Sequence, residues 1–341
     1  MTGALRSRIF QASAAVALAA IILALGYLGT RGQPGTRSFP AEKLSIAMPT
    51  VPHSALLYIA AAKGYFAEEG LEVTMMPTIH GKAAINLVLQ GKADLGAASE
   101  VVFVLATTGG GALGIAASMM SNSNDLAVIA RRDHGITAPR DLVGKKVGGT
   151  LGTSGEYFLW AFLIRNKLRP GSVTLVDMPP DQIAPGIAAG TIDATSTWQP
   201  NVLNVQRALG DNAVTFYEPE SYTQTFNLIG RSDFLKGHVK AIKKLMRAML
   251  KAEQFMRSRP KETLNLVAEW LKIDVDALRP TWKQFDFRVN LLQSHLITLE
   301  DVSRWAMARG YAAKGPVPNF LPHLYLDALL AVEPERMTVL H

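Results

Sequence analysis

The chain has 341 residues, of which 48% are hydrophobic and 18% charged, so it has enough apolar material for one large domain or two smaller ones. The net charge of +7 is compatible with nucleic-acid binding, but Lys and Arg are scattered, and their densest run, residues 236–259, has a helical pattern typical of a solvated face. We therefore expect no nucleic-acid partner. The absence of cysteine excludes disulfides, thiolate metal sites, thiol catalysis and a lipid-modified N-terminal cysteine.

The first 35 residues have the features of an export signal. Arg6 and Arg8 precede an uncharged, apolar run over residues 9–30, and the chain then turns polar at residues 31–35. This order is typical of a secretory signal peptide, but about 20 apolar residues are also enough for an uncleaved membrane anchor. No small-x-small cleavage site stands out, so both alternatives remain open. Either one places residues from 36 onward outside the cytoplasm, because the positive charges stay inside.

From residue 44 the pattern alternates between strands and helices. Short apolar runs predict strands, and periodic runs that begin at a capping residue and stop at glycine predict helices. The predicted strands of this first unit are residues 44–48, 71–75, 93–98 and 113–118, and its helices are residues 55–63, 82–90 and a segment capped by Ser99. Apolar strands joined through helices indicate a parallel sheet that is covered on both faces.

A second α/β unit of similar length follows, which suggests a duplicated architecture. Its predicted strands are residues 126–131, 146–150, 173–176, 192–195 and 213–216, with a helical turn at 139–142 and helices at 155–166, 184–189 and 202–209. A strand at 222–229 then returns, and the chain is helical to its end. The helical segments are residues 239–250, a segment from Pro260, and residues 299–307.

The most distinctive stretch, residues 145–160, predicts a strand, a glycine-rich turn and a helix. Gly152 and Gly155 permit a sharp turn, and Thr153 or Ser154 can cap the helix, so that its first N–H groups point forward. Such a corner can bind an anion, although it could equally be a plain connecting turn. It is not a nucleotide-binding phosphate loop, because no Lys followed by Ser or Thr comes after the glycines. No spacing of His and carboxylates indicates a metal site.

Several segments resemble a known family of transport proteins. They are Met48-Pro49-Thr50 with His53, YIAAAKGYFAEEGLEV at residues 58–73, GKADLG at 91–96 and DLVGKKVG at 141–148. These segments resemble the periplasmic substrate-binding proteins of the nitrate, sulfonate, taurine and thiamine-precursor importers, and the resemblance covers roughly residues 44–231. The segment from Lys63 to Val73 is the most specific part of it.

The resemblance implies an α/β fold of the type II periplasmic binding proteins. In that fold two α/β lobes surround a hinge and a cleft, and a helical C-terminal extension packs on the first lobe. Lobe 1 is expected to comprise residues 36–128 and 225–341, and lobe 2 residues 129–224, with hinge crossings near 126–132 and 222–231. The implied protein is a monomer that clamps a small-molecule solute and delivers it to an ABC permease and its ATPase, without a cofactor or catalytic residues.

The family's binding site, carried over residue by residue, falls on polar side chains that follow the predicted strands. Open α/β sheets bind ligands at the carboxyl ends of their strands, where helix N-termini gather. The expected ligand contacts in lobe 1 are Thr50, His53, Ser54, His80, Gly81, Ser99 and Glu100. Those in lobe 2 are Thr153, Ser154, Glu156, Asp181 beside Pro180, and Trp198.

These residues also have structural alternatives. His53 could fill a turn, Ser99 and Ser154 could be ordinary caps, and Trp198 could belong to the core. If Glu100 and Glu156 face the cleft, their charges discourage a bare oxyanion such as nitrate. They then favour a ligand with an amine or several N–H or O–H donors, such as taurine or a pyrimidine. Otherwise they only complement the helix dipoles.

Two rival functions remain. Fungal pyrimidine synthases of the same fold use their own His and Lys, but no Lys adjoins His53 here, no Cys/His iron cluster is present, and an export signal does not suit a cytoplasmic enzyme. An uncleaved N-terminal anchor would instead suit a membrane-anchored ligand sensor. We expect a non-enzymatic, periplasmic solute receptor of an ABC importer that takes a sulfonate-like, taurine-like or nitrogen-containing solute.

Overall fold

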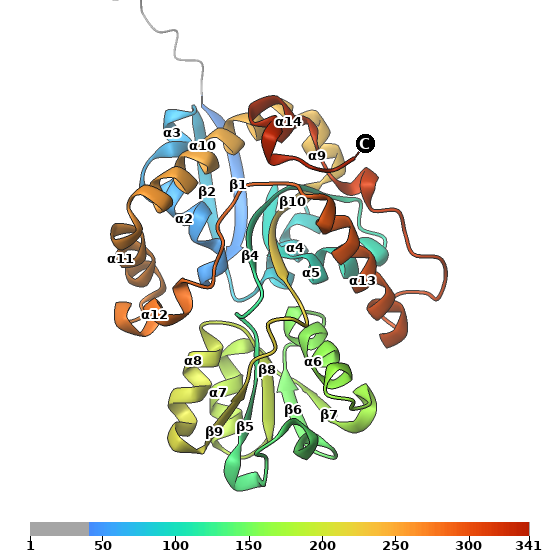
Figure 1. Cartoon of the computed structure of the whole chain (residues 1–341). Helices are drawn as coiled ribbons and strands as arrows, with labels where there is room; N and C mark the ends of the chain where they lie inside the picture. Colours follow the sequence, from blue (N-terminus) through green and yellow to red (C-terminus); the bar gives the residue numbers. More distant parts are fainter. Residues whose placement is uncertain (1–40, 341) are drawn as a thin grey trace, which may run out of the picture. The chain divides into compact units, whose positions relative to one another are not determined.

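Two five-stranded sheets are formed within residues 41–340, the part of the chain that the computed structural model describes (Figure 1). The first has the order β2-β1-β3-β10-β4, with β1 Glu42–Pro49, β2 Leu71–Thr78, β3 Leu95–Ser99, β4 Leu113–Asn122 and β10 Gln224–Arg231. The second has the order β7-β6-β8-β5-β9, with β5 Ala127–Arg131, β6 Lys146–Gly149, β7 Thr174–Asp177, β8 Ala194–Thr197 and β9 Ala213–Phe216. The predicted signal or anchor, residues 1–35, and residues 36–40 lie outside the described residues.

Both sheets are mixed, and they share one plan. In the first, β1 runs parallel to β2 and β3, and β10 runs antiparallel to β3 and β4. In the second, β6 runs parallel to β7 and β8, and β5 runs antiparallel to β8 and β9. The four strands predicted as a parallel sheet, β1 to β4, run in one direction, but the sheet that contains them is mixed. The antiparallel strands are β5 and β10. Each enters its sheet by a crossing from the other, residues 123–126 and 217–223, without the crossover helix that a parallel connection needs.

Helices cover both sheets, and the tail supplies further helices. Around the first sheet are α2 Ala55–Ala62, α3 Tyr65–Glu68, α4 Gly81–Leu89 and α5 Glu100–Thr108, and around the second α6 Ser154–Arg165, α7 Pro180–Ala188 and α8 Asn201–Leu209. The tail holds α9 Ser232–Gly237, α10 Val239–Ser258, α11 Pro260–Leu271, α12 Val275–Trp282, α13 Gln293–Arg309 and α14 Asp327–Val332. The 3-10 turns are η1 Pro52–Ser54, η2 Arg132–His134, η3 Pro139–Leu142, η4 Pro170–Ser172, η5 Gly210–Asn212, η6 Leu321–His323 and η7 Pro334–Arg336.

The tail packs on the first sheet's side, as predicted. The apolar stripe of α10, which includes Leu245 and Met249, is buried, and the helix contacts α2 and α3. On its polar face, Arg247 Nε lies 2.6 Å from Glu69 Oε2. The segment before α13 joins β4 through a bridge between Asn290 and Ser118, and α13 itself contacts α5.

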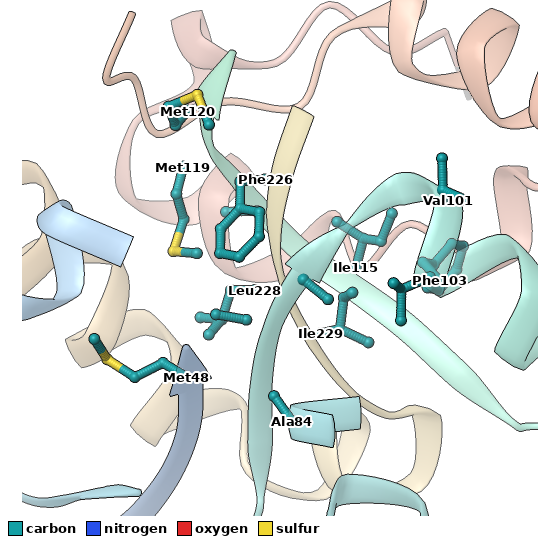
Figure 2. Close-up of a cluster of buried hydrophobic side chains, with 14 of the residues drawn as sticks. Met48, Ala84, Val101, Phe103, Ile115, Met119, Met120, Phe226, Leu228 and Ile229 are labelled. Carbon is teal, nitrogen blue, oxygen red and sulfur yellow. The ribbon is translucent and has the colours of Figure 1, made fainter. Parts of the chain in front are cut away.

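The core of the first sheet lies on both faces of β10 (Figure 2). Alternate residues of a strand point to opposite faces. Phe226 and Leu228 lie on one face of β10 near Met119, and Ile229 lies on the other near Ile115 (Figure 2). All five are buried. The returning strand thus joins the two layers of the core.

None of the helices within residues 41–340 is long and apolar enough to cross a bilayer. The predicted signal or membrane anchor falls on residues that the structure does not describe. The residue bounds of the two predicted lobes also stay a prediction.

Candidate functional site

Loops that follow strands of both sheets meet at one pocket. After β1, β2 and β3 come His53 in η1, His80 at the N-cap of α4 and Ser99 at the N-cap of α5. The second sheet contributes Thr153, the N-cap residue of α6, and Trp198 after β8. The pocket is lined by Pro49, Val51, His53, His80, Gly81, Ser99, Val102, Thr153, Ser154, Trp198, Gln224 and Phe226.

The lining favours an anion electrostatically. The N-cap residues of three helices, α4, α5 and α6, line the pocket, so the positive ends of these helix dipoles lie beside it. Glu100 and Glu156, in the first turns of α5 and α6, offset part of this positive charge. Within residues 41–340, no Asp or Glu lines the pocket. The cavity is small, about 20 Å³, which is roughly the space of one water molecule. A solute larger than water therefore needs the walls to separate.

His53 is held by a buried carboxylate. Its Nε2 lies 2.7 Å from Asp125 Oδ2, and the two side chains are 1% and 0% exposed. The ring also packs against Phe226 and Phe285, with centroid separations of 5.2 and 5.3 Å. Because the Nε2–H group donates to Asp125, Nδ1 is the ring nitrogen that remains for a further hydrogen bond. Nδ1 has no hydrogen-bond partner among residues 41–340. Nδ1 accepts a hydrogen bond in the neutral ring and donates one in the protonated ring.

His80 and Gln224 supply further polar groups. The Nδ1 of His80 accepts a hydrogen bond from the Ala83 N–H at 2.9 Å, which places the proton of the neutral ring on Nε2 as a donor. Burial lowers the pKa of His80, and Lys82 lowers it further, so the neutral ring is favoured. Gln224 of β10 donates to Ser154 Oγ at 3.0 Å, and this bond joins a strand of the first sheet to a helix of the second.

The turn before α6, residues 151–155, is here called the glycine corner. Gly152 has a φ of 72°, a left-handed conformation that glycine adopts without strain. A Cβ on Gly155 would lie 3.0 Å from the Ser196 carbonyl oxygen, so the absent side chain lets α6 start close to β8. Thr153 Oγ1 donates to the Thr150 carbonyl at 2.6 Å. These contacts place Thr153 and Ser154 on the pocket wall.

Glu100 and Glu156, both predicted as ligand contacts, do not line the pocket. Glu100 accepts hydrogen bonds from the Tyr222 hydroxyl and from the N–H and Oγ1–H of Thr225, the latter at 2.8 and 2.9 Å. Burial raises its pKa to about 7. Glu156 binds the Gly152 N–H, Arg309 and Tyr311 instead. The expectation that two cleft carboxylates oppose a bare oxyanion therefore loses its basis.

Three other predicted contacts also lie outside the lining. Thr50 is exposed, Ser54 is fully buried, and Asp181 is exposed in the first turn of α7. The side-chain caps predicted at Ser99 and Thr153 are absent, because both residues occupy N-cap positions without a side-chain capping bond. His53, His80, Gly81, Ser99, Thr153, Ser154 and Trp198 are brought together at the pocket.

Asp125 and Gln224 are site residues that the sequence pattern did not predict. Asp125 lies in the first crossing and Gln224 begins β10, the strand that the second crossing feeds. Their signal was available in principle, because residues where the chain changes sheet border the cleft. Among residues 41–340, no group of three or more His, Asp or Glu is placed to hold a metal ion.

The family model described as NMT1/THI5 like matches residues 51–263, more than half of the chain. The chain belongs to this family. A Brucella abortus relative named only as a binding protein is 24% identical over 227 residues, 65% of this chain and 69% of the relative. The taurine-binding periplasmic protein of Escherichia coli is 24% identical over 223 residues, 64% of this chain and 68% of the relative.

The proteins that this chain resembles include both binding proteins and an enzyme. The alkanesulfonate-binding protein SsuA of Xanthomonas axonopodis, solved with bound MOPS, superposes with a TM-score of 0.72 at 15% identity, covering 84% of this chain and 99% of that one. This likeness confirms the predicted two-sheet binding-protein fold. A Schizosaccharomyces pombe pyrimidine phosphate synthase is 26% identical over a shorter stretch, 142 residues, which is 42% of this chain and 40% of the synthase.

Proposed function

We propose that the chain is an exported solute-binding protein of an ABC importer, and that its solute carries an oxyanion head such as a sulfonate. The observation that supports this most directly is the pocket lining, which gathers three helix N-termini and two histidines without any carboxylate. The taurine-binding relative and the alkanesulfonate-binding structural neighbour agree with this ligand class.

The proposed contacts divide the solute into a head and a body. The Nε2–H of neutral His80 and the N–H groups at the start of α6 suit the oxygens of the head, and His53 Nδ1 joins them as a donor only in the protonated ring. Trp198 and Phe226 offer aromatic walls for an organic body. Ser99, Thr153 and Ser154 add hydroxyls. The missing side chain of Gly81 lets α4 begin close to Ala98 of β3.

Entry of the solute requires the two sheets to separate, because the cavity of about 20 Å³ is too small for any sulfonate. The two crossings, residues 123–126 and 217–223, are the places where such a hinge motion would occur. The closed protein would then dock on a membrane permease driven by its ATPase. We propose that it does so as a monomer in the periplasm.

A binding screen tests this function. Taurine, longer alkanesulfonates, nitrate, amines, pyrimidines and small carboxylates are added to the purified chain, and its thermal unfolding is followed. A ligand at 100 times its dissociation constant adds about 2.7 kcal/mol of stability. We expect sulfonates to stabilise the chain and amines without an oxyanion to have no effect. Stabilisation by none of these compounds would contradict the proposal, and stabilisation by pyrimidines alone would move it to thiamine precursors.

The anchored-sensor alternative depends on residues 1–35, which the structure does not describe. The mass of the N-terminal peptide of the exported protein distinguishes the two. A start near residue 30 supports a freely diffusing receptor, and a start at Met1 supports the sensor.

A further inference from the structure

Three donors converge on the carboxylate of Glu156 at the start of α6. Arg309 reaches Oε1 with its Nε at 3.2 Å and its second guanidinium nitrogen at 3.0 Å, and the Tyr311 hydroxyl reaches Oε2 at 2.7 Å. The third donor is the Gly152 N–H, 2.8 Å from Oε2. The Glu156 side chain is 2% exposed, and that of Arg309 is 31% exposed. A buried carboxylate is thus held by charge-assisted hydrogen bonds from the tail.

The two partners of this contact belong to different halves of the fold. Glu156 starts a helix that covers the second sheet, whereas Arg309 ends α13, which contacts α5 beside the first sheet. Near its beginning, α13 shares a groove with residues 219–225, the second crossing and the start of β10. The helix therefore runs from the crossing to the glycine corner, and its far end makes the contact with Glu156.

An aromatic cluster continues this contact toward the crossing. Trp305 of α13 lies edge-on to Tyr157 of α6 at 5.4 Å, and Tyr157 lies edge-on to Tyr222 of the crossing at 4.9 Å. Tyr311 packs on Trp305 at 5.5 Å. A hinge rotation at the crossing displaces the atoms near the crossing least and the atoms far from it most. Separation of the sheets would therefore change the Arg309 and Tyr311 contacts more than the Tyr157 contacts.

The same carboxylate is linked to the solute pocket. The Glu156 carboxylate accepts a hydrogen bond from the Gly152 N–H, and this bond holds the conformation of the glycine corner. The two residues after Gly152, Thr153 and Ser154, line the pocket. The corner also receives a bond from Lys82 Nζ to the Leu151 carbonyl at 3.2 Å. The position of the pocket wall thus depends on how the carboxylate is held.

We propose that Arg309 and Tyr311 are positioning residues for the solute site: they hold Glu156 and the glycine corner against the first half of the fold when the cleft is closed. The inference rests on the proposed function for its link to solute affinity. Neither residue lines the pocket, so neither acts by touching the solute. Opening breaks their bonds to Glu156 and hydrates the freed groups. The contact therefore favours the closed state and slows solute release.

Spin labels on the two halves provide a test that needs no ligand. The chain contains no cysteine, so Asn86→Cys on α4 and Gln182→Cys on α7, both exposed, introduce two unique labelling sites. Distance distributions are recorded by pulsed electron paramagnetic resonance for the ligand-free chain. Arg309→Met and Tyr311→Phe remove the donors, and Arg309→Lys restores a cation. Arg304→Met is the matched control, because Arg304 lies on the same helix but pairs only with Glu300 and Asp301 on the surface.

We expect Arg309→Met and Tyr311→Phe to shift the distances toward the open state, Arg309→Lys to recover part of the shift, and Arg304→Met to leave them unchanged. With taurine as the probe, affinity should fall about 5- to 150-fold in Arg309→Met, mainly through faster dissociation. Distances that match those of Arg304→Met would overturn the inference, even if the melting temperature falls. If taurine and the other compounds of the screen fail to bind the unmodified chain, the proposed function fails, and the distances still decide the role of Arg309.

Discussion

Glu100 and Glu156 occupy similar places in the two halves of the fold but have different surroundings. Each lies in the first turn of a helix whose N-cap residue lines the pocket, and each turns away from that pocket. Glu100 is bound only by neutral donors, Tyr222 and Thr225, at the crossing and the strand that it enters. Glu156 is bound by a cation from the tail. Glu100 therefore makes the stability of the fold depend on pH, whereas the contacts of Glu156 link it to the opening of the cleft.

The largest expected effect is the pH dependence that Glu100 imposes. Burial raises its pKa from the ordinary 4.5 to about 7, so between these values the folded chain keeps a proton that the unfolded chain has lost. The stabilisation is complete below pH 4.5 and disappears as the pH rises through 7, a change of roughly 3 kcal/mol. We expect Glu100→Gln to remove this slope, because the amide does not titrate. The free energy of unfolding, measured with urea at several pH values from 4.5 to 8, gives this slope.

The difference between the unmodified chain and Glu100→Gln is the quantity to compare, since other carboxylates also titrate over this range. Glu69, whose pKa is lowered by its bonds to Lys251 and Arg247, contributes a slope of the opposite sign at lower pH. Glu69→Gln serves as the matched control and should leave the slope between pH 5 and 7 intact, because the lowered pKa of Glu69 places its titration below that range. Equal slopes in the unmodified chain and Glu100→Gln would contradict the assigned protonation.

The next effect concerns the pair of Glu156 and Arg309. Because the carboxylate is buried and the guanidinium is about one third exposed, we expect a coupling energy of about 1–2 kcal/mol. A double-mutant cycle with Glu156→Gln and Arg309→Met, measured by urea unfolding at pH 7, gives this value. The surface pair of Arg304 and Glu300 provides the reference cycle and should give less than about 0.5 kcal/mol. If both cycles give the same coupling energy, the pair of Glu156 and Arg309 contributes no more than an ordinary surface pair.

The fold was largely predictable from the sequence, and the directions of two strands were not. Apolar runs separated by glycines and caps locate β1 and β6 to within a residue or two. A strand's direction depends on the connection that precedes it. β5 and β10 are preceded by crossings rather than helices, so the β-α-β pattern gives no direction for these two strands. The short helices α12 and α14 were missed because each lacks a long apolar period, and α12 also contains Pro280.

The candidate site was predictable where chain position alone places a residue at the end of a strand. Ser99 ends β3, and His80 and Thr153 come shortly after the ends of β2 and β6, so all three lie at the pocket. The orientation of Glu100 and Glu156 depends on partners 122 to 155 residues away, Tyr222, Thr225, Arg309 and Tyr311. No local pattern encodes such partners.

A third buried carboxylate, Asp125, sharpens the contrast, because it touches a lining residue directly. We expect Asp125→Asn to weaken sulfonate binding about tenfold, corresponding to about 1.4 kcal/mol, since a neutral amide forms a weaker hydrogen bond with the His53 Nε2–H than a carboxylate does and holds the ring less firmly at the pocket. Isothermal titration with taurine measures the loss. Asp181→Asn is the matched control, because Asp181 is exposed and outside the lining. Unchanged affinity in Asp125→Asn would show that His53 needs no support from this carboxylate.

The smallest expected effect is that of Lys82. Its Nζ donates to the Leu151 carbonyl at 3.2 Å, so it also joins the first half of the fold to the glycine corner. Unlike the contact of Glu156, this bond is exposed to water, where a lysine exchanges a protein oxygen for a solvent one at little cost. We expect Lys82→Met to change taurine affinity less than about threefold and to leave the label distances unchanged. If Lys82→Met lost as much taurine affinity as Arg309→Met, any bond between the first half of the fold and the glycine corner would be enough to support solute binding. Burial of Glu156 would then not be what separates the two contacts.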